Sequence, residues 1–144
     1  MNPITPFVAS LLICSFPWNL SADSPQIRVS IQARVHNGDD ARMLSALSHE
    51  FRNLDGVSVT DTQPALKIYC DVNYPLPVQS KTMFQIMASL YAASVTIITP
   101  DGRLIAHFVE TSSTLHQLAQ EITIRVDGGV FEPMRRSAKP SSSP

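Results

Sequence analysis

The stretch "QIRVSIQARVHNGDD", residues 26–40, indicates the fold class because it joins a strand pattern to the start of a helix. Apolar side chains occupy every second position of residues 27–35, and the positions between them are polar: Arg28, Ser30, Gln32 and Arg34. A period of two over this length predicts a strand with one buried face. Asn-Gly at residues 37–38 then favours a turn, and either Asp39 or Asp40 is suited to cap a helix.

Two helices are predicted, since apolar side chains recur at three- and four-residue spacing in two places. The first helix presents the stripe Leu44, Leu47, Phe51 and Leu54. Asp55-Gly56 ends it, because glycine takes the left-handed position after a helix without steric cost. The second helix, capped by Ser113 or Thr114, presents the stripe Leu115, Leu118, Ala119, Ile122 and Val126. We expect "DGG" at 127–129 to end it.

Further strands are predicted between the two helices. A short strand is predicted from Val57, with Val59 on the same face. A longer strand, ending near Pro75, buries Leu66, Ile68, Cys70 and Val72. "PLPVQSK", residues 75–81, is expected to be a loop because proline cannot donate to a central strand. Residues 83–99 form a long β-type stretch. "TPDGRL", residues 99–104, predicts a turn to a partner strand over 103–112.

The order of these elements predicts an α+β fold with the order β-α-β-β-β-β-α. We expect a two-layer sandwich, in which a mainly antiparallel sheet of four to five strands carries both amphipathic helices on one face. The domain is expected to span residues 23–131. Residues 132–144 lack apolar periodicity, and they are expected to form a disordered tail.

The amino-terminal segment has the order of parts of an export signal. Residues 1–22 contain no charged side chain, an apolar run covers residues 7–16, and Ala22 offers a cleavage site. The segment lacks early lysine or arginine, and Leu20 stands where a small residue is usual. We expect a signal peptide over residues 1–22 and an exported protein, in the periplasm or cell envelope. Acylation of Cys14 is disfavoured by the bulky Ile13, and the remaining alternative is a mis-called start codon or a disordered cytosolic tail.

Composition excludes some partners. Eleven Lys and Arg against twelve Asp and Glu give a net charge of -1. Such a chain has no basic field to attract nucleic acid, so we expect no nucleic-acid partner. The apolar run of the signal is shorter than the roughly 20 residues that a membrane-spanning helix needs, and we expect no transmembrane span in the mature chain.

The sequence predicts no catalytic residue, cofactor or metal ligand. It contains no phosphate-binding glycine loop and no nucleophile elbow. "HEFRN", residues 49–53, begins like a zinc-protease helix, but Asn53 stands where the second histidine belongs. The alternative is a small enzyme or ligand-binding module whose site is assembled from distant residues, and His49, Cys70 and His107 are then the first candidates. Cys70 shares its strand parity with apolar residues, which favours a buried structural role.

One sheet face is expected to bind a partner. Assigning Leu90, Leu104 and Phe108 to the core leaves apolar side chains on the opposite face: Met87, Tyr91, Ile105 and Val109. Arg34, Tyr69 and Tyr91 are predicted to be partner-binding, because Tyr and Arg are enriched in binding hot spots. Apolar residues on a second face suggest that something covers it. The cover is an unknown envelope partner, a second copy of the chain, or the chain's own loop or tail.

The chain resembles small bacterial envelope accessory domains. The resemblance covers residues 26–131 and rests on a strand-helix-strand start, on "VSVTDTQPALKIYCDV" (57–72), on the "PDGRL" hairpin (100–104) and on "LAQEI" (118–122). Domains of this plan include the amino-terminal domain of the Tol-Pal translocation protein, curli-secretion-type lipoproteins and the lipopolysaccharide-assembly lipoprotein. The resemblance implies a non-enzymatic binding or scaffold role at the envelope, with no catalytic residues to transfer.

Overall fold

The computed structural model describes residues 26–77 and 89–138, and for residues 74–77 and 89 it describes the backbone alone. The predicted signal peptide with Cys14, the first part of the 83–99 stretch with Met87, and the end of the tail lie outside the described residues. The elements, in chain order, are β1 (Ile27–Val35), α1 (Asp40–Arg52), β2 (Val57–Val59), β3 (Leu66–Pro77), β4 (Ser89–Ile98), β5 (Leu104–Ser112), α2 (Leu115–Val126), η1 (Asp127–Phe131) and α3 (Glu132–Ala138).

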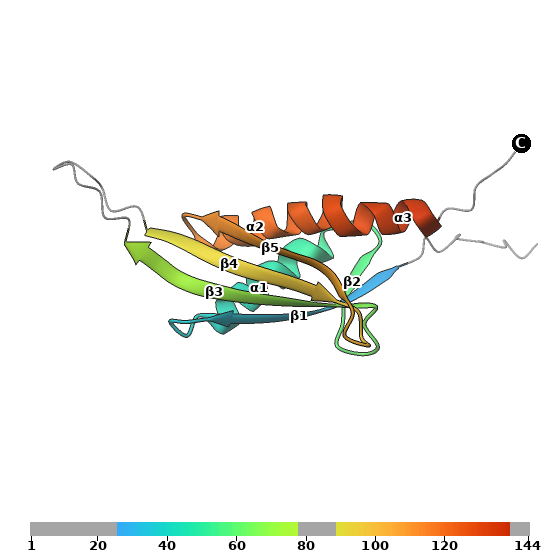
Figure 1. The fold of residues 1–144 in the computed structure, drawn as a ribbon, viewed down its shortest axis with the longest axis horizontal. Coiled ribbons are helices and arrows are strands. Elements are labelled where there is room, and N and C mark those ends of the chain that lie inside the picture. Colours follow the sequence, from blue (N-terminus) through green and yellow to red (C-terminus); the bar gives the residue numbers. More distant parts are fainter. Residues whose placement is uncertain (1–25, 78–88, 139–144) are drawn as a thin grey trace, which may run out of the picture.

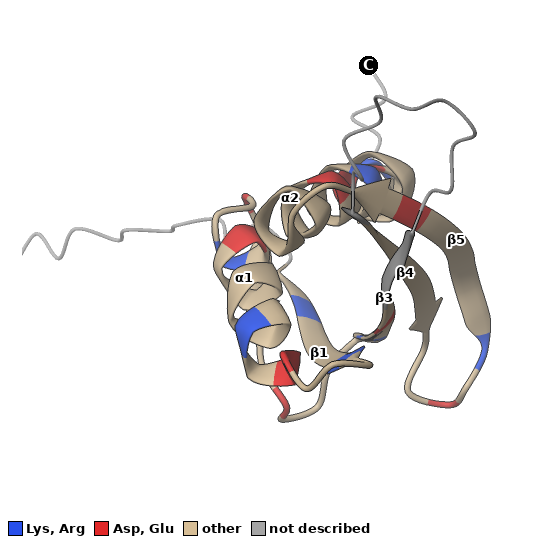
Figure 2. Cartoon of the chain, turned by 90° about the vertical axis from the view of Figure 1, so that its left-hand side faces the viewer, with Lys and Arg blue, Asp and Glu red and all other residues tan. Residues whose placement is uncertain are grey.

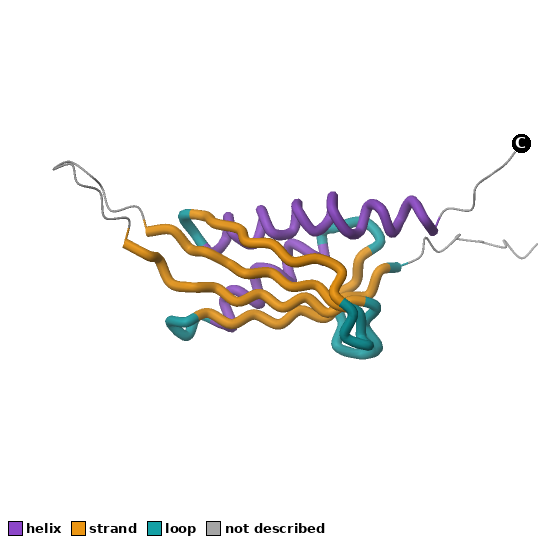
Figure 3. The backbone as a smooth tube through the Cα atoms, in the orientation of Figure 1, coloured by secondary structure: helices purple, strands orange, loops and turns teal. Residues whose placement is uncertain are grey.

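The five strands form one open sheet in the order β2-β1-β3-β4-β5 (Figures 1 and 3). β1 pairs in parallel with both β2 and β3, whereas β3–β4 and β4–β5 are antiparallel and longer. The parallel pairs follow from α1, since the helix carries the chain back to the end of the sheet where β1 began. The predicted α+β class and the mostly antiparallel five-stranded sheet are therefore confirmed.

Both helices cover the same face of the sheet (Figures 1 and 2). α1 contacts β1 and β2, α2 contacts β4 and β5, and the two helices contact each other. Between the layers lies a single core, whose largest fully buried side chains are Phe51, Phe131, Met43, Leu47, Ile68, Ile97, Leu118 and Ile122. This arrangement leaves the other face of the sheet without a covering layer among the described residues.

The buried stripe of α1 differs from the prediction by one residue. Met43, Leu47 and Phe51 are fully buried, while Leu44 is 38% exposed. Leu54 is half-buried against the core. Asp39 is the N-cap residue without a side-chain capping bond. Asp40 instead accepts a hydrogen bond from the Val35 backbone N–H at 2.5 Å, which ties the end of β1 to the start of α1.

The last helix begins as predicted but continues further. Thr114 caps α2 by accepting from the Gln117 backbone N–H at 3.1 Å, and the predicted apolar stripe is buried. The predictions that "DGG" ends this helix and that disorder begins at residue 132 are wrong: five residues of π-helix and then α3 carry the helical run to Ala138. The extension places Phe131 against Phe51, with ring centroids 5.8 Å apart in an edge-to-face arrangement, a favourable aromatic geometry.

The strands around the β3–β4 connection also differ from the prediction. β3 runs to Pro77, with a register shift between Asn73 and Leu76. Pro75 therefore does not end the strand, because an irregular position tolerates a residue without an N–H. β4 is described from Ser89 onward. The predicted turn before β5 is confirmed: the Gly102 backbone N–H donates to the Thr99 carbonyl at 2.9 Å, and Gly102 has φ of 89°.

Candidate functional site

The outer face of the sheet, defined here as the face opposite α1 and α2, carries the main candidate site. Arg34 on β1 and Tyr69 on β3 lie on it, because the alternate residues of both strands are buried on the helix side. Cross-strand pairing sets two rows of side chains over this face. One row is Gln32, Tyr69, Thr96 and His107, and the other is Arg34, Asp71, Ser94 and Val109.

The members of these rows on β1, β3 and β4 line a shallow depression of about 570 Å³. Its side chains come from the outer face and from the start of α1: Gln32, Arg34, Asp40, Tyr69, Asp71, Ser94 and Thr96. The lining is mostly polar, with the half-buried ring of Tyr69 as its aromatic member. β4 contributes hydroxyls and no charge, since that strand contains no Lys, Arg, Asp or Glu (Figure 2). Such a surface can form hydrogen bonds with a partner and bury an aromatic anchor.

Two polar contacts organise the outer face. His36 Nε2 lies 3.4 Å from Asp71 Oδ1 at the end of β1, and both side chains are about half exposed. Thr96 Oγ1 and His107 Nδ1 lie 3.0 Å apart across β4 and β5. Exposed pairs of this kind contribute little to stability. They orient side chains on the surface more than they hold the fold together.

The β5 side of the outer face is apolar. Leu104, Ile105 and Val109 are 60%, 39% and 58% exposed. Their clustering follows from a register shift, since Ile97 pairs with Ala106 and Ile98 pairs with Leu104, which leaves Ile105 as an extra residue. A bulge of this kind breaks the alternation of a strand. Leu104, which we assigned to the core, is therefore on the outer face.

The predicted parity of β4 is wrong. Tyr91 has the parity of the fully buried Ala93, Val95 and Ile97, and it packs against the core on the helix side. Leu90, assigned to the core by the sequence, is 40% exposed. Phe108 is half-buried against the core as expected, and Ile105 and Val109 lie on the outer face as expected. Of the three predicted partner-binding residues, Arg34 and Tyr69 share the outer face and Tyr91 does not.

Cys70 occupies the buried position that strand alternation predicts. It is 3% exposed among Leu66, Ile68 and Val72. Burial, together with the neighbouring Asp71 carboxylate, raises the pKa of the Cys70 thiol from 9.0 to about 12. A thiol with so high a pKa is not ionised at neutral pH, and the thiolate is the nucleophilic form. The environment of Cys70 is that of a structural residue.

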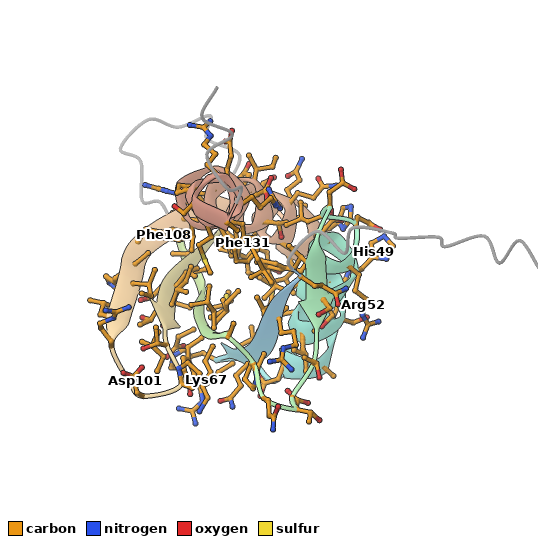
Figure 4. The ribbon with its side chains drawn as sticks, turned by 90° about the vertical axis from the view of Figure 1, so that its right-hand side faces the viewer. His49, Arg52, Lys67, Asp101, Phe108 and Phe131 are labelled. Atoms are coloured by element: carbon orange, nitrogen blue, oxygen red, sulfur yellow. The ribbon has the colours of Figure 1, made fainter. Side chains whose placement is uncertain are left out.

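The three residues of the alternative enzyme hypothesis do not converge. His49 lies on the exposed side of α1, across the molecule from Phe108 (Figure 4). Cys70 is in the core, and His107 lies on the outer face of the sheet. In the part of the chain that the structure describes, no group of three or more His, Cys, Asp or Glu side chains is placed to hold a metal ion.

A second shallow depression lies between the helices. About 470 Å³ in volume, it is lined by Arg42, Ser45, Ala46, His49, Leu115 and His116. Sequence reasoning did not place His49 and His116 at one depression, because they lie far apart in the chain and only the packing of α1 against α2 brings them to the same surface. Within residues 26–77 and 89–138, no helix is both long enough and apolar enough to span a membrane.

No family model matches the chain. No curated protein matches it in sequence. Among solved structures, the chain is similar to protein XCC0632 from Xanthomonas campestris, of the DUF330 family, with 9% identity, a TM-score of 0.54, and coverage of 81% of this chain and 89% of that chain. It is also similar to the PelC dodecamer from Paraburkholderia phytofirmans, with 12% identity, a TM-score of 0.48, and coverage of 73% and 89%.

A third solved structure is the minor lipoprotein from Acinetobacter baumannii, with 14% identity, a TM-score of 0.48, and coverage of 71% of this chain and 93% of that chain. No argument is drawn from the two structures with a TM-score of 0.48. The likeness to XCC0632 shows a shared fold alone, since the sequences are so far apart. The resemblance to the three envelope families stays a prediction.

Proposed function

We propose that this chain is an exported, non-catalytic accessory domain of the bacterial cell envelope that binds another envelope component through the outer face of its sheet. The observation that carries the proposal is the asymmetry of the two sheet faces. One face is sealed by two helices, while the other presents Arg34, Tyr69 and an apolar edge around a depression. A surface that combines apolar area, tyrosine and arginine has the composition of a protein-binding site.

The envelope location is supported by the uncharged stretch of residues 1–22. Mass spectrometry of the protein from its native host tests export, with a mature chain expected to start near Asp23. Recovery of only an intact Met1 species in the cytosol contradicts export. A mass increment of acyl chains on Cys14 instead shows a lipid-anchored form.

Charge reversal on the outer face tests binding. Arg34→Glu and Tyr69→Glu are expected to leave the melting temperature within a few degrees, as surface changes do. Both should weaken a partner recovered from the native host by about 2 kcal/mol or more if these residues are hot spots. Arg42→Glu, on the exposed side of α1, is the matched control and should bind as the wild type does. Wild-type recovery by both outer-face variants overturns the proposal.

A further inference from the structure

The β5 strand is an open edge of the sheet. In the strand order, β5 has β4 on one side and no strand among the described residues on the other. The opposite edge, β2, is only three residues long, whereas β5 spans nine. A long edge strand presents a row of N–H and C=O groups that can pair with another strand. Natural edges are often blunted by lysine, proline or a β-bulge. Residues Leu104–Ser112 contain no lysine or proline, and the bulge lies at the Leu104 end, so that Ala106–Ser112 pair regularly with β4.

The hydrogen-bonding groups of this edge can be assigned. The Val109 carbonyl accepts from Arg125 Nη1 at 3.3 Å, and Arg125 belongs to a helix, so this carbonyl points away from β4. Residues of an antiparallel strand alternate between pairing with one neighbour and with the other. His107 therefore belongs with Val109 to the outward-directed set. A carbonyl has two lone pairs, so Val109 can accept a strand N–H while Arg125 stays bound.

The edge is complementary to itself. If two β5 strands meet antiparallel with His107 on the two-fold axis, Ile105 lies opposite Val109 of the second copy, and this pair occurs twice. On the helix side, Ala106 lies opposite Phe108 of the second copy, a small residue against a large one. The exposed apolar side chains of both copies then join in one continuous patch across the seam, and such reciprocal pairs are typical of a two-fold interface.

Other registers are less favourable. With the axis at Val109, Ile105 lies opposite Ser113 of the second copy, beyond the end of β5, and loses its apolar partner. With the axis at Ile105, Val109 lies opposite Asp101 of the second copy, which belongs to the turn before β5. Cross-strand pairs of apolar residues stabilise a sheet, and only the axis at His107 keeps both Ile105–Val109 pairs. The register centred on His107 is therefore selected.

We infer that two copies of this chain pair through their β5 strands, antiparallel about His107, to form one continuous sheet. The dimer joins the two outer faces side by side and brings the exposed Leu104, Ile105 and Val109 of both copies into one apolar patch. This inference does not rest on partner binding by Arg34 and Tyr69, because the purified chain alone tests it.

Charge-swapped variants at the axis give the sharpest test. His107 is exposed and contacts the Thr96 hydroxyl on the surface, so His107→Glu and His107→Lys should stay folded. Each variant alone sets two like charges opposite each other, and each should raise the dimer dissociation constant by at least about tenfold. When the two variants are mixed, glutamate of one copy lies opposite lysine of the other at the axis. The mixed dimer should therefore form. Sedimentation equilibrium over a concentration series measures all three.

Matched controls and a variant-free measurement complete the test. His49→Glu and His49→Lys on exposed α1 should dimerise as the wild type does. In the wild-type protein, exchange of the His107 and Val109 amide hydrogens should slow as the protein concentration rises. A wild-type protein that stays monomeric, exchange at these amides that is independent of concentration, or a variant mixture that stays monomeric overturns the inference. If only one of the two variants, His107→Glu or His107→Lys, weakens the dimer, His107 does not face its own copy across the axis. That result overturns the inference as well.

Discussion

Arg125 lies over the ring of Phe108, with 4.7 Å between its Cζ and the ring centroid. Its Nη1 is also 2.8 Å from Glu110 Oε2. One side chain of α2 thus contacts both an aromatic ring and a carboxylate of β5. This contact fixes the helix over the edge strand.

Arg125→Ala is expected to lower the free energy of unfolding by about 0.5–1.5 kcal/mol. The cation–π contact is worth about 0.5–1 kcal/mol at an exposed site, and the ion pair adds little because the Arg125 side chain is 53% exposed. Urea unfolding measures the difference. Arg42→Ala, on the exposed side of α1, is the control and should change stability by no more than about 0.5 kcal/mol. Equal effects of the two substitutions would show that the Phe108 contact contributes nothing.

Tyr91→Glu should destabilise the domain, whereas Tyr69→Glu should not. Tyr91 packs against the core from the helix side of β4, and a carboxylate there is moved from water against apolar side chains. We expect a loss of about 1–3 kcal/mol at Tyr91 and about 0.5 kcal/mol or less at Tyr69. Thermal unfolding of the two variants compares the faces of the sheet directly. The reverse ranking would restore the parity that we first assigned to β4.

The buried Cys70 thiol should make stability fall at alkaline pH. Its pKa is 9.0 ordinarily and about 12 in the folded protein. Between these values the unfolded chain loses the thiol proton and the folded chain keeps it, so the unfolded state is favoured as pH rises. The slope contributed by this group is at most about 1.4 kcal/mol per pH unit.

The comparison for Cys70 is the Cys70→Ala variant, whose unfolding free energy is followed by urea titration over the same pH range. The variant starts from a lower stability because it leaves a small cavity. It should nevertheless fall less steeply with pH than the wild type. Parallel pH profiles of the two proteins would mean that Cys70 ionises as readily folded as unfolded.

Gly128→Ala and Gly129→Ala should each stabilise the protein. Both glycines lie in the exposed π-helical turn, and an added Cβ would meet no atom within 4 Å at either position. Glycine in a helical segment costs roughly 0.5–1 kcal/mol relative to alanine, so each change should raise the free energy of unfolding by about that amount. Thermal unfolding checks it. Gly102→Ala is the control, since φ of 89° there makes alanine strained and destabilising.

The sequence by itself determined the elements whose patterns are local. Residue spacing predicts the alternation of β1 and β3 and the stripe of α2, because one face of each element must be apolar and the other exposed to water. Residue type predicts the Thr114 cap and the 99–104 turn. With them came the α+β class, the buried Cys70, and the placement of Arg34 and Tyr69 on the outer face.

The tertiary structure alone decided what local patterns left open. Met43 and Leu44 are adjacent apolar residues on α1, and either extends a stripe, so only the position of the sheet and α2 selects Met43. Apolar and small residues occupy both faces of β4, so its sequence does not show which face is buried. The pairing of Val95 with the buried Cys70 decides which residues of β4 face the helices. The bulge that gathers Leu104 and Ile105 at the open edge depends on pairing with β4.

The helical run beyond "DGG" was decided in the same way. Glycine is a weak helix former. The local sequence therefore predicts that the helix ends at "DGG", residues 127–129. Phe131 is fully buried and meets Phe51, a residue of the other helix. The free energy of burying that ring, about 1.5–3 kcal/mol, exceeds the local cost of either glycine, and a contact between residues so far apart in the chain is visible only in the folded molecule.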